Sequence, residues 1–371
     1  MKIGLDLRMA STDYGIGRYS LELVRAILER DRKNEYVLFV RDPAVFKKSG
    51  FDLHSNITLV EANYRHYSFA EQFGFSFLLT SYNLDLTHFL NFNVPLMYRR
   101  RFVATIHDLV HHKLPGNKKR RFLHRLAYRA VMRHAVFASK RIITVSNASK
   151  NDLVQTYRLP EEKIKVIYEA AAPFPVTDSD VAEVRQRYGI DKPYLIFVGV
   201  MERKKNVPLL AKGFDILKER YQQNVQLVLV GKMDPHYPEV LDLAKTIKYR
   251  KDLVITGPLT DKEKYALYKG AEVFVSASKF EGFGLPGVEA MSIGLPLAVS
   301  NTAVFNEVYD NGALYFNPDD PNDIAEKVNL LLTDQKYKQL VANNAYARAQ
   351  IFSWANAAKQ TIDLYNSLAL E

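Results

Sequence analysis

The chain of 371 residues contains no cysteine. Structural disulfides, thiolate zinc sites, iron–sulfur clusters and a cysteine nucleophile are therefore excluded. The sequence also lacks any run approaching the roughly 20 apolar residues that a membrane-spanning helix needs. Asp6 and Arg8 interrupt the first apolar run, so we expect no signal peptide. There is neither an internal repeat of about 20 to 50 residues nor a low-complexity tract, which argues against solenoids and propellers.

The composition that remains is that of a globular protein, with 47% hydrophobic and 25% charged residues. This balance argues against the disordered and fibrous classes. Because 371 residues exceed the length of one ordinary domain, the sequence predicts two compact domains.

The net charge of +10 is concentrated in the first half of the chain. Residues 1–175 carry 28 Lys and Arg against 16 Asp and Glu, whereas the remainder is slightly acidic. The densest basic stretch is 99–141, where Asp108 is the only acid. A surface of this kind indicates an anionic partner, which could be a membrane, a nucleic acid or a phosphorylated substrate.

A helix predicted over 118–137 carries much of this charge. Its apolar residues form a stripe that we expect to face the core: Phe122, Leu123, Leu126, Ala127, Ala130 and Val131. Basic residues follow each other at four-residue steps along another ridge: Arg121, Arg125, Arg129 and Arg133. Like charges at this spacing destabilise a helix by roughly 0.2–0.5 kcal/mol per pair. We therefore favour an anionic membrane surface as the partner of this ridge, and a solvated basic face is the alternative.

Short apolar runs alternate with amphipathic helical patterns along the whole chain, which is typical of parallel βαβ units. The segment 169–178 has two prolines and no periodicity, so it predicts a linker. We therefore expect two Rossmann-like doubly wound α/β domains, 1–172 and 173–351, that face each other across a ligand-binding cleft. The expected strands lie at 3–7, 36–40, 84–90, 102–106, 141–145 and 165–168, then at 194–200, 226–230, 253–256, 273–276, 297–300 and 313–316.

The most informative segment follows the strand expected at 273–276. A glycine-rich loop there leads into a helix, and its backbone N–H groups are placed to bind phosphate. Glu281 in the loop and Glu289 in the first helical turn suit sugar hydroxyls, because carboxylates accept hydrogen bonds from vicinal hydroxyls. A nucleotide sugar carries both groups, and the alternative is a surface loop in which Glu289 only stabilises the helix dipole. The loop residues concerned are Gly282, Phe283, Gly284 and Leu285.

Three consecutive cations, Arg203, Lys204 and Lys205, follow the strand expected at 194–200. At the carboxyl edge of the first strand of a doubly wound domain, such side chains are placed to neutralise a diphosphate. A solvated run of charges is the alternative.

In the first half, Gly15 and Gly17 form an incomplete dinucleotide-binding loop, which we interpret as a flexible loop that closes on the cleft. His107 follows the strand expected at 102–106 and is placed to contact a sugar hydroxyl or a transition-state oxygen. A structural histidine is the alternative reading of His107. His111 and His112 lack carboxylates at matching spacing, so we expect no bound metal.

Taken together, these segments resemble the family-4 retaining glycosyltransferases of GT-B fold. The last helical pattern resembles the closing helix of that family, which crosses back onto the first domain, so we assign 352–371 to the first domain. Many members have an arginine directly after the glycine that matches Gly199, whereas this chain has Val200, with Arg203 and Lys204 a few residues later. The landmarks span nearly the whole chain: 15–19, 106–108, 143–150, 198–199 with 205–206, Glu281 with Glu289, and 352–354.

The resemblance implies that the second domain binds a nucleoside diphosphate sugar and the first domain binds the acceptor. In the family, the residues that match Glu289, Glu281 and Lys205 hold the ribose, the transferred sugar and the diphosphate, and His107 matches a residue that contacts the sugar. No cofactor or metal is implied. The Lys-Lys-Asn sequence at 204–206 resembles members that use GDP-mannose, which we prefer to UDP sugars.

We therefore predict a retaining hexosyltransferase, cytoplasmic and peripherally associated with the inner face of the membrane, that builds a surface polysaccharide or glycolipid on a glycan or lipid-linked acceptor. The motifs contain no obvious carboxylate nucleophile, so we favour front-face attack, in which the departing phosphate takes the proton of the acceptor hydroxyl. The alternatives are a phosphorylase or nucleotide-sugar epimerase of the same fold, and a nucleic-acid-binding protein.

Overall fold

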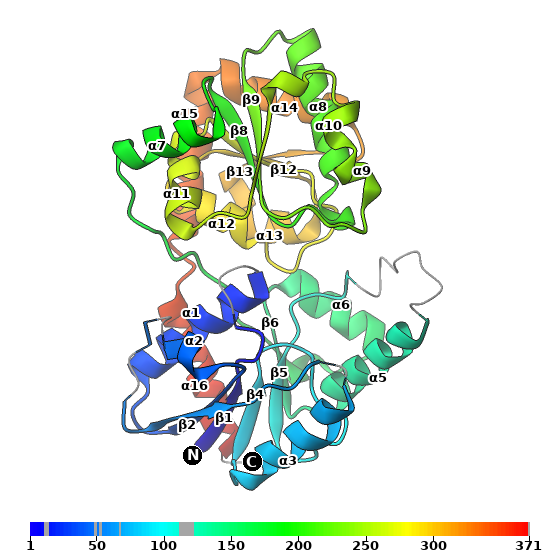
Figure 1. Cartoon of the computed structure of the whole chain (residues 1–371), viewed down its shortest axis with the longest axis vertical. Helices are drawn as coiled ribbons and strands as arrows, with labels where there is room; N and C mark the ends of the chain where they lie inside the picture. Colours follow the sequence, from blue (N-terminus) through cyan, green and yellow to red (C-terminus); the bar gives the residue numbers. More distant parts are fainter. Residues whose placement is uncertain (11–14, 48–49, 52–53, 67, 111–121, 370–371) are drawn as a thin grey trace. The chain divides into compact units, whose positions relative to one another are not determined.

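The computed structural model describes the whole chain except residues 11–14, 48–49, 52–53, 67, 111–121 and 370–371. It divides into two compact units (Figure 1). The first unit comprises Met1–Glu169 and Trp354–Glu371, and the second comprises Ala170–Ser353. The chain passes from the first unit to the second at the start of the segment 169–178.

The first unit is built on a parallel sheet of seven strands in the order β3-β2-β1-β4-β5-β6-β7. β2 and then β3 are added on one side of β1. The chain then returns and adds β4 on the other side of β1, so the order reverses between β1 and β4. Helices cover the sheet, and α1 and α16 pack side by side (Figure 1). The strands are β1 (Lys2–Asp6), β2 (Glu35–Val40), β3 (Ile57–Glu61), β4 (Leu86–Phe89), β5 (Phe102–Thr105), β6 (Arg141–Thr144) and β7 (Ile164–Val166). The helices are α1 (Gly15–Arg30), α2 (Pro43–Lys47), a π-helical turn (Glu71–Phe75), α3 (Ser76–Ser81), α5 (Phe122–Ala138), α6 (Asn147–Tyr157), a short 3₁₀ turn (Glu161–Lys163) and α16 (Trp354–Ala369).

The second unit repeats this plan with six parallel strands in the order β10-β9-β8-β11-β12-β13. Here the order reverses between β8 and β11. The strands are β8 (Tyr194–Val198), β9 (Gln226–Val230), β10 (Leu253–Gly257), β11 (Val273–Ser276), β12 (Leu297–Ser300) and β13 (Ala313–Phe316). The helices are α7 (Asp178–Tyr188), α8 (Val207–Arg220), α9 (Pro238–Leu241), α10 (Leu243–Thr246), α11 (Asp261–Gly270), α12 (Leu285–Met291), α13 (Ala303–Tyr309), α14 (Pro321–Thr333) and α15 (Gln335–Ala349), with 3₁₀ turns at Arg203–Lys205, Arg250–Asp252 and Asp310–Gly312.

These two doubly wound sheets confirm the predicted fold class, with one additional strand. The sequence prediction missed β3, because only Val60 of its five residues is buried and an edge strand of this kind shows no continuous apolar run. The expected apolar stripe on α5 is also partly wrong. Leu126 and Ala130 are exposed, and α5 buries residues further along the helix: Val131, Met132, Ala135 and Val136. Arg121 lies outside the described residues.

The closing helix α16 belongs to the first unit. The hydroxyl of Tyr365 lies 2.6 Å from Nδ1 of His88, and Nε2 of His88 lies 2.8 Å from the hydroxyl of Thr105. Burial, with the nearby charge of His107, lowers the pKa of His88 to about 3, so the ring is neutral and both hydrogen bonds join uncharged groups. No helix in the described part of the chain is both long and apolar enough to cross a membrane.

We expect Tyr365→Phe to lower the free energy of unfolding of the first unit by about 1–3 kcal/mol, because it leaves a buried nitrogen of His88 without its partner. Trp354, the only tryptophan, lies in α16 and reports this transition by its fluorescence during urea unfolding. Tyr346→Phe, at a half-exposed position on α15, is the matched control and should have almost no effect. Equal stability of the wild type and Tyr365→Phe would contradict the assignment.

Candidate functional site

Two of the predicted site residues meet at the point where the strand order of the second unit reverses. Lys205 ends the 3₁₀ turn that follows β8, and Glu281 lies in the loop that follows β11. Nζ of Lys205 lies 2.5 Å from Oε1 of Glu281, and both side chains are about nine-tenths buried. A cation and an anion from distant parts of the sequence are therefore held together at the carboxyl edge of the sheet, where open α/β sheets bind ligands.

Glu289 lies in the helix that follows the loop of Glu281, and its carboxylate is held by two side chains of α11. Oε1 accepts a hydrogen bond from Nζ of Lys264 at 2.9 Å, and Oε2 accepts one from the hydroxyl of Tyr268 at 3.1 Å. Glu289 is buried and lies in the second turn of α12, not in the first turn as expected. Each oxygen of a carboxylate has two lone pairs, so Glu289 retains acceptor capacity for ligand hydroxyls.

The start of α11 explains why Lys264 and Tyr268 reach the same carboxylate. Thr260 and Glu263 form a capping box, in which the backbone N–H of Thr260 donates to Oε2 of Glu263 at 3.0 Å. This cap fixes where the helix begins. Lys264 and Tyr268 are then one turn apart on the same face, so both side chains point towards α12.

Tyr309 fixes the shape of the glycine-rich loop. Its hydroxyl donates to the carbonyl oxygen of Gly284 at 2.7 Å, and burial together with the charge of Glu281 raises the pKa of Tyr309. Gly284 has a φ of +90°, and a Cβ there would lie 2.3 Å from the Tyr309 hydroxyl. Only glycine therefore fits this turn.

The remaining predicted donor residues are less clearly directed at a ligand. Phe283 and Leu285 are buried, and the Phe283 ring packs against Phe352 at 5.4 Å between centroids. Arg203 is exposed, and Nζ of Lys204 lies 3.3 Å from Glu202. Their roles, like those of the buried Gly282 in the same loop, stay predictions.

Gly15 and Gly17 belong to the first unit and form the first turn of α1. Gly15 is exposed, with no atom within 4 Å of where its Cβ would be, while Gly17 is buried. They are not brought together with the donor residues inside one unit. Their predicted closure over a cleft therefore stays a prediction.

His107 follows β5 in the first unit, and both of its ring nitrogens face protein acceptors. Nδ1 lies 3.2 Å from Oε1 of Glu169, and Nε2 lies 3.1 Å from the carbonyl oxygen of Leu90. Only a doubly protonated ring donates at both positions. The edge of the Tyr19 ring lies against the imidazole, with 4.6 Å between ring centroids. Both ring nitrogens of His107 are thus occupied by protein groups, so neither is aimed at a ligand.

Sequence reasoning missed Lys264, Tyr268, Tyr309 and Glu169. None stands in a motif, because each acquires its role only when two separate helices or strands pack together. A strand-end position was the one signal available for Glu169, which lies shortly after β7. Within the described part of the chain, no group of three or more His, Asp or Glu side chains is placed to hold a metal ion.

Comparisons with known proteins match both units. Residues 14–171 match the model of glycosyltransferase family 4, and residues 180–348 match the model of glycosyl transferases group 1. The chain is 27% identical over 370 residues to O-antigen chain mannosyltransferase B of Escherichia coli, covering 95% of this chain and 96% of that protein. It is 25% identical over 321 residues to the O-antigen chain mannosyltransferase RfbU of Salmonella typhimurium, covering 84% and 86%.

Solved structures share the fold. The crystal structure of Anabaena HepE in complex with UDP and glucose aligns with a TM-score of 0.77 at 19% identity, covering 99% of this chain and 100% of that one. At this identity, the likeness speaks for the fold alone.

We expect Lys264→Met to destabilise the second unit by about 3 kcal/mol, because it leaves the buried carboxylate of Glu289 without its cation. Adding Glu289→Gln to this variant should restore most of the loss. Calorimetry measures the stability of both variants. Trp354 lies in the first unit, so the calorimetric transition that its fluorescence does not follow is the unfolding of the second unit. Lys245→Met removes an exposed ion pair and is the control. A Lys264→Met protein as stable as this control would refute the pairing.

Proposed function

Because this chain belongs to the family-4 glycosyltransferases of GT-B fold, and is thus a hexosyltransferase rather than a nucleic-acid-binding protein, we propose that it transfers mannose from GDP-mannose, with retention of configuration, to a growing surface glycan. The observation that carries the proposal is the meeting of Lys205 and Glu281 beside a preformed Glu289 site at one sheet edge. Two O-antigen mannosyltransferases among the relatives support the choice of sugar and of product class.

In this proposal the donor separates the ion pair of Lys205 and Glu281. A diphosphate is a stronger partner for the Lys205 ammonium than one carboxylate, because it carries more negative charge. Glu281 is then released to accept hydrogen bonds from the hydroxyls of the sugar. Glu289 stays fixed by Lys264 and Tyr268 and accepts hydrogen bonds from the ribose hydroxyls. Arg203 or Lys204 supplies the second positive charge.

The chemical step breaks the bond between the anomeric carbon and the diphosphate oxygen, and the electron pair leaves with the diphosphate. The acceptor hydroxyl oxygen forms the new bond on the same face, and its proton passes to a phosphate oxygen. Lys205 stabilises the charge that develops on the leaving group. His107, held between Glu169 and the carbonyl oxygen of Leu90, lies on the acceptor side and orients the segment that follows β4. These side chains do the neutralising here, so the proposal includes neither a metal nor another cofactor.

We place the acceptor at the cytoplasmic surface of an anionic membrane. Arg125, Arg129 and Arg133 are exposed on α5, and the Arg133 guanidinium lies over the Phe137 ring. A second exposed ridge is apolar. Phe69 lies just before the π-helical turn, Phe73 lies within it and Phe77 lies in α3, and they are exposed by 85%, 59% and 77%. Basic side chains together with exposed aromatic rings are the composition of a membrane-interface surface. A lipid-linked acceptor would be presented at such a surface.

The donor assignment is tested by thermal-shift measurements with GDP, UDP, ADP and their sugars, first without and then with divalent metal. We expect the guanine series to stabilise the wild type, by about 2.7 kcal/mol when ligand is at 100 times its Kd. Glu289→Gln should lose this shift, whereas Glu326→Gln on exposed α14 should keep it. A thermal shift with UDP alone would mean that the base of the donor is uracil and not guanine. No shift with any diphosphate would refute the donor site.

The membrane assignment is tested by co-sedimentation with vesicles of phosphatidylglycerol and phosphatidylcholine. Replacing Arg125, Arg129 and Arg133 together by alanine should lower binding about 100-fold, because each basic side chain near an anionic surface contributes about 1 kcal/mol. Replacing the exposed lysines 245, 248 and 262 of the second unit is the matched control and should leave binding unchanged. Equal binding to neutral vesicles would count against an electrostatic contact.

A further inference from the structure

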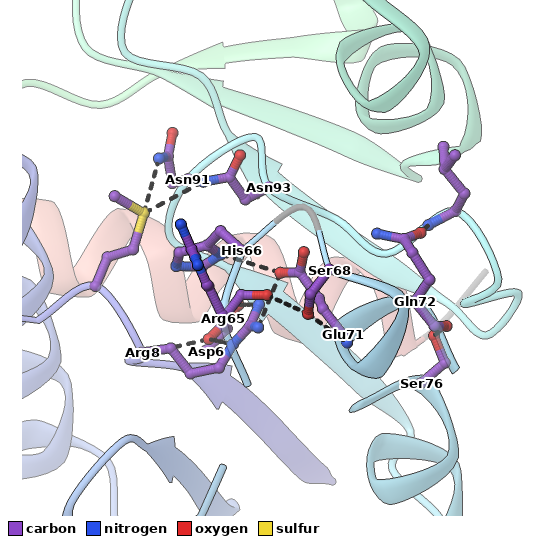
Figure 2. Close-up of polar contacts among 12 residues, drawn as sticks. Asp6, Arg8, Arg65, His66, Ser68, Glu71, Gln72, Ser76, Asn91 and Asn93 are labelled. Atoms are coloured by element: carbon purple, nitrogen blue, oxygen red, sulfur yellow. Dashed lines mark hydrogen bonds and ion pairs between the residues drawn. The ribbon is translucent and has the colours of Figure 1, made fainter. Parts of the chain in front are cut away.

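The first unit has its own reversal point, and a polar cluster occupies it. β1 and β4 are neighbours there, with Asp6 paired in register with Phe89. Asp6 ends β1, while Asn91 and Asn93 follow β4, so all three lie at the carboxyl edge of the sheet. Figure 2 shows these residues with side chains from the segment after β3. We call Asp6, Arg8, His66, Glu71, Asn91 and Asn93 the reversal-point cluster.

The base of the cluster is a buried ion triad. Nε and Nη2 of Arg8 donate to the two oxygens of Asp6 at 2.9 and 2.8 Å, and Nη1 donates to Oε1 of Glu71 at 2.9 Å. The guanidinium lies 3.7 Å from the centre of the Phe75 ring. Burial alone would raise the pKa of Glu71, but the hydrogen bond with His66 and the charge of Arg8 outweigh it and lower the pKa. Two carboxylates thus face one guanidinium.

Above this base, three polar groups have weak partners or none. Asn91 and Asn93 both direct their amide Nδ2 at the sulfur of Met9, at 3.1 and 3.4 Å (Figure 2). A thioether is a weak acceptor. Asn93 is only 8% exposed, and its buried Oδ1 has no hydrogen-bond partner among the described residues. Nε2 of His66 is also buried and has no partner in the described part of the chain, while Nδ1 lies 3.0 Å from Glu71.

Such unsatisfied groups indicate a ligand with hydroxyl groups. A buried polar atom without a hydrogen bond destabilises the free protein, so a ligand that supplies the bond gains affinity there. An amide offers both donors and an acceptor, and the second ring nitrogen of an imidazole offers one more hydrogen-bonding group, which matches the hydroxyl groups of a sugar. The two amides would exchange the Met9 sulfur for stronger acceptor oxygens.

We propose that the reversal-point cluster binds an uncharged sugar residue of the acceptor, with Asn91, Asn93 and His66 as the contacts and the ion triad as their rigid support. The charge of the cluster argues for a sugar and against a phosphate. The carboxylates of Asp6 and Glu71 lie at the base of the cluster, and a phosphate would meet both of them at close range. This proposal rests on the proposed function for the identity of the acceptor as a glycan.

The contact to His107 connects this cluster to the reacting groups. Nε2 of His107 lies 3.1 Å from the carbonyl oxygen of Leu90, the residue before Asn91. The segment after β4 therefore joins the cluster to His107 without intervening residues. A sugar held by Asn91 and Asn93 would lie close to that ring.

The test uses the full-length protein and methyl α-D-mannopyranoside as the probe, with binding followed by saturation-transfer NMR. We expect Asn93→Ala to weaken sugar binding about fivefold, the effect of losing one uncharged hydrogen bond. Asn93→Asp, which keeps the shape and removes the amide donor, should weaken it by a similar factor. Met9→Leu is the matched control and should bind the sugar within about twofold of the wild type, because the volume is kept and the sulfur holds the amides only in the free protein. Mannose 6-phosphate should bind more weakly than the neutral probe.

Several results would overturn the proposal. One is the absence of any saturation-transfer signal for the sugar when the wild type is mixed with about 50 mM probe. This concentration exceeds the Kd of weak sites, which is about 1 mM. Others are unchanged binding in both Asn93 variants, or a loss caused by Glu281→Gln instead, which would place the sugar in the donor site. Titration of GDP into the same samples reports the donor site separately. Loss of GDP binding with the sugar effects intact would refute the donor proposal alone.

Discussion

Parallel strands have all their carboxyl ends at one edge of a sheet, and every chemical group considered above depends on that constraint. Where the strand order reverses, the connecting segments leave in opposite directions and an opening remains between them. The chain uses this twice, between β1 and β4 and between β8 and β11. Side chains remote in sequence, such as Lys205 and Glu281, become neighbours there without any local motif joining them.

Both reversal points contain buried, paired charges, which contribute little to stability because desolvation offsets most of their attraction. These pairs serve to orient side chains, because a carboxylate that is bound to a cation is ionised and fixed in position before a ligand binds. The pairs differ in what a ligand does to them. In the proposed function, Glu289 keeps Lys264 when hydroxyls bind, whereas Lys205 leaves Glu281 to reach a diphosphate. The second unit would then combine one fixed anion with one that is released.

Sequence reasoning reached the fold because strands of a parallel sheet are buried on both faces and give continuous apolar runs. It failed where that cause is missing, as at Ile57–Glu61 on the sheet edge. Lys205, Glu281 and Glu289 were predicted as site residues since each follows a strand or lies close behind one in sequence. Lys264 and Tyr268 were not, because their contact with Glu289 exists only when α11 packs on α12. Asp6 and Arg8 had appeared merely as polar interruptions, since nothing in the sequence places Glu71 beside them.

The helix α16 gives the chain an unusual order of assembly. The second unit is complete in sequence at Ser353, but the first unit needs residues from 354 onwards to cover α1 and to pair His88. During synthesis on a ribosome, the segment made first is therefore the last to be finished. Until α16 emerges, the ring of His88 lacks its partner Tyr365 and the face of α1 that α16 covers is open to water. The second unit can meanwhile fold as an intact domain, so the order of folding runs against the order of translation.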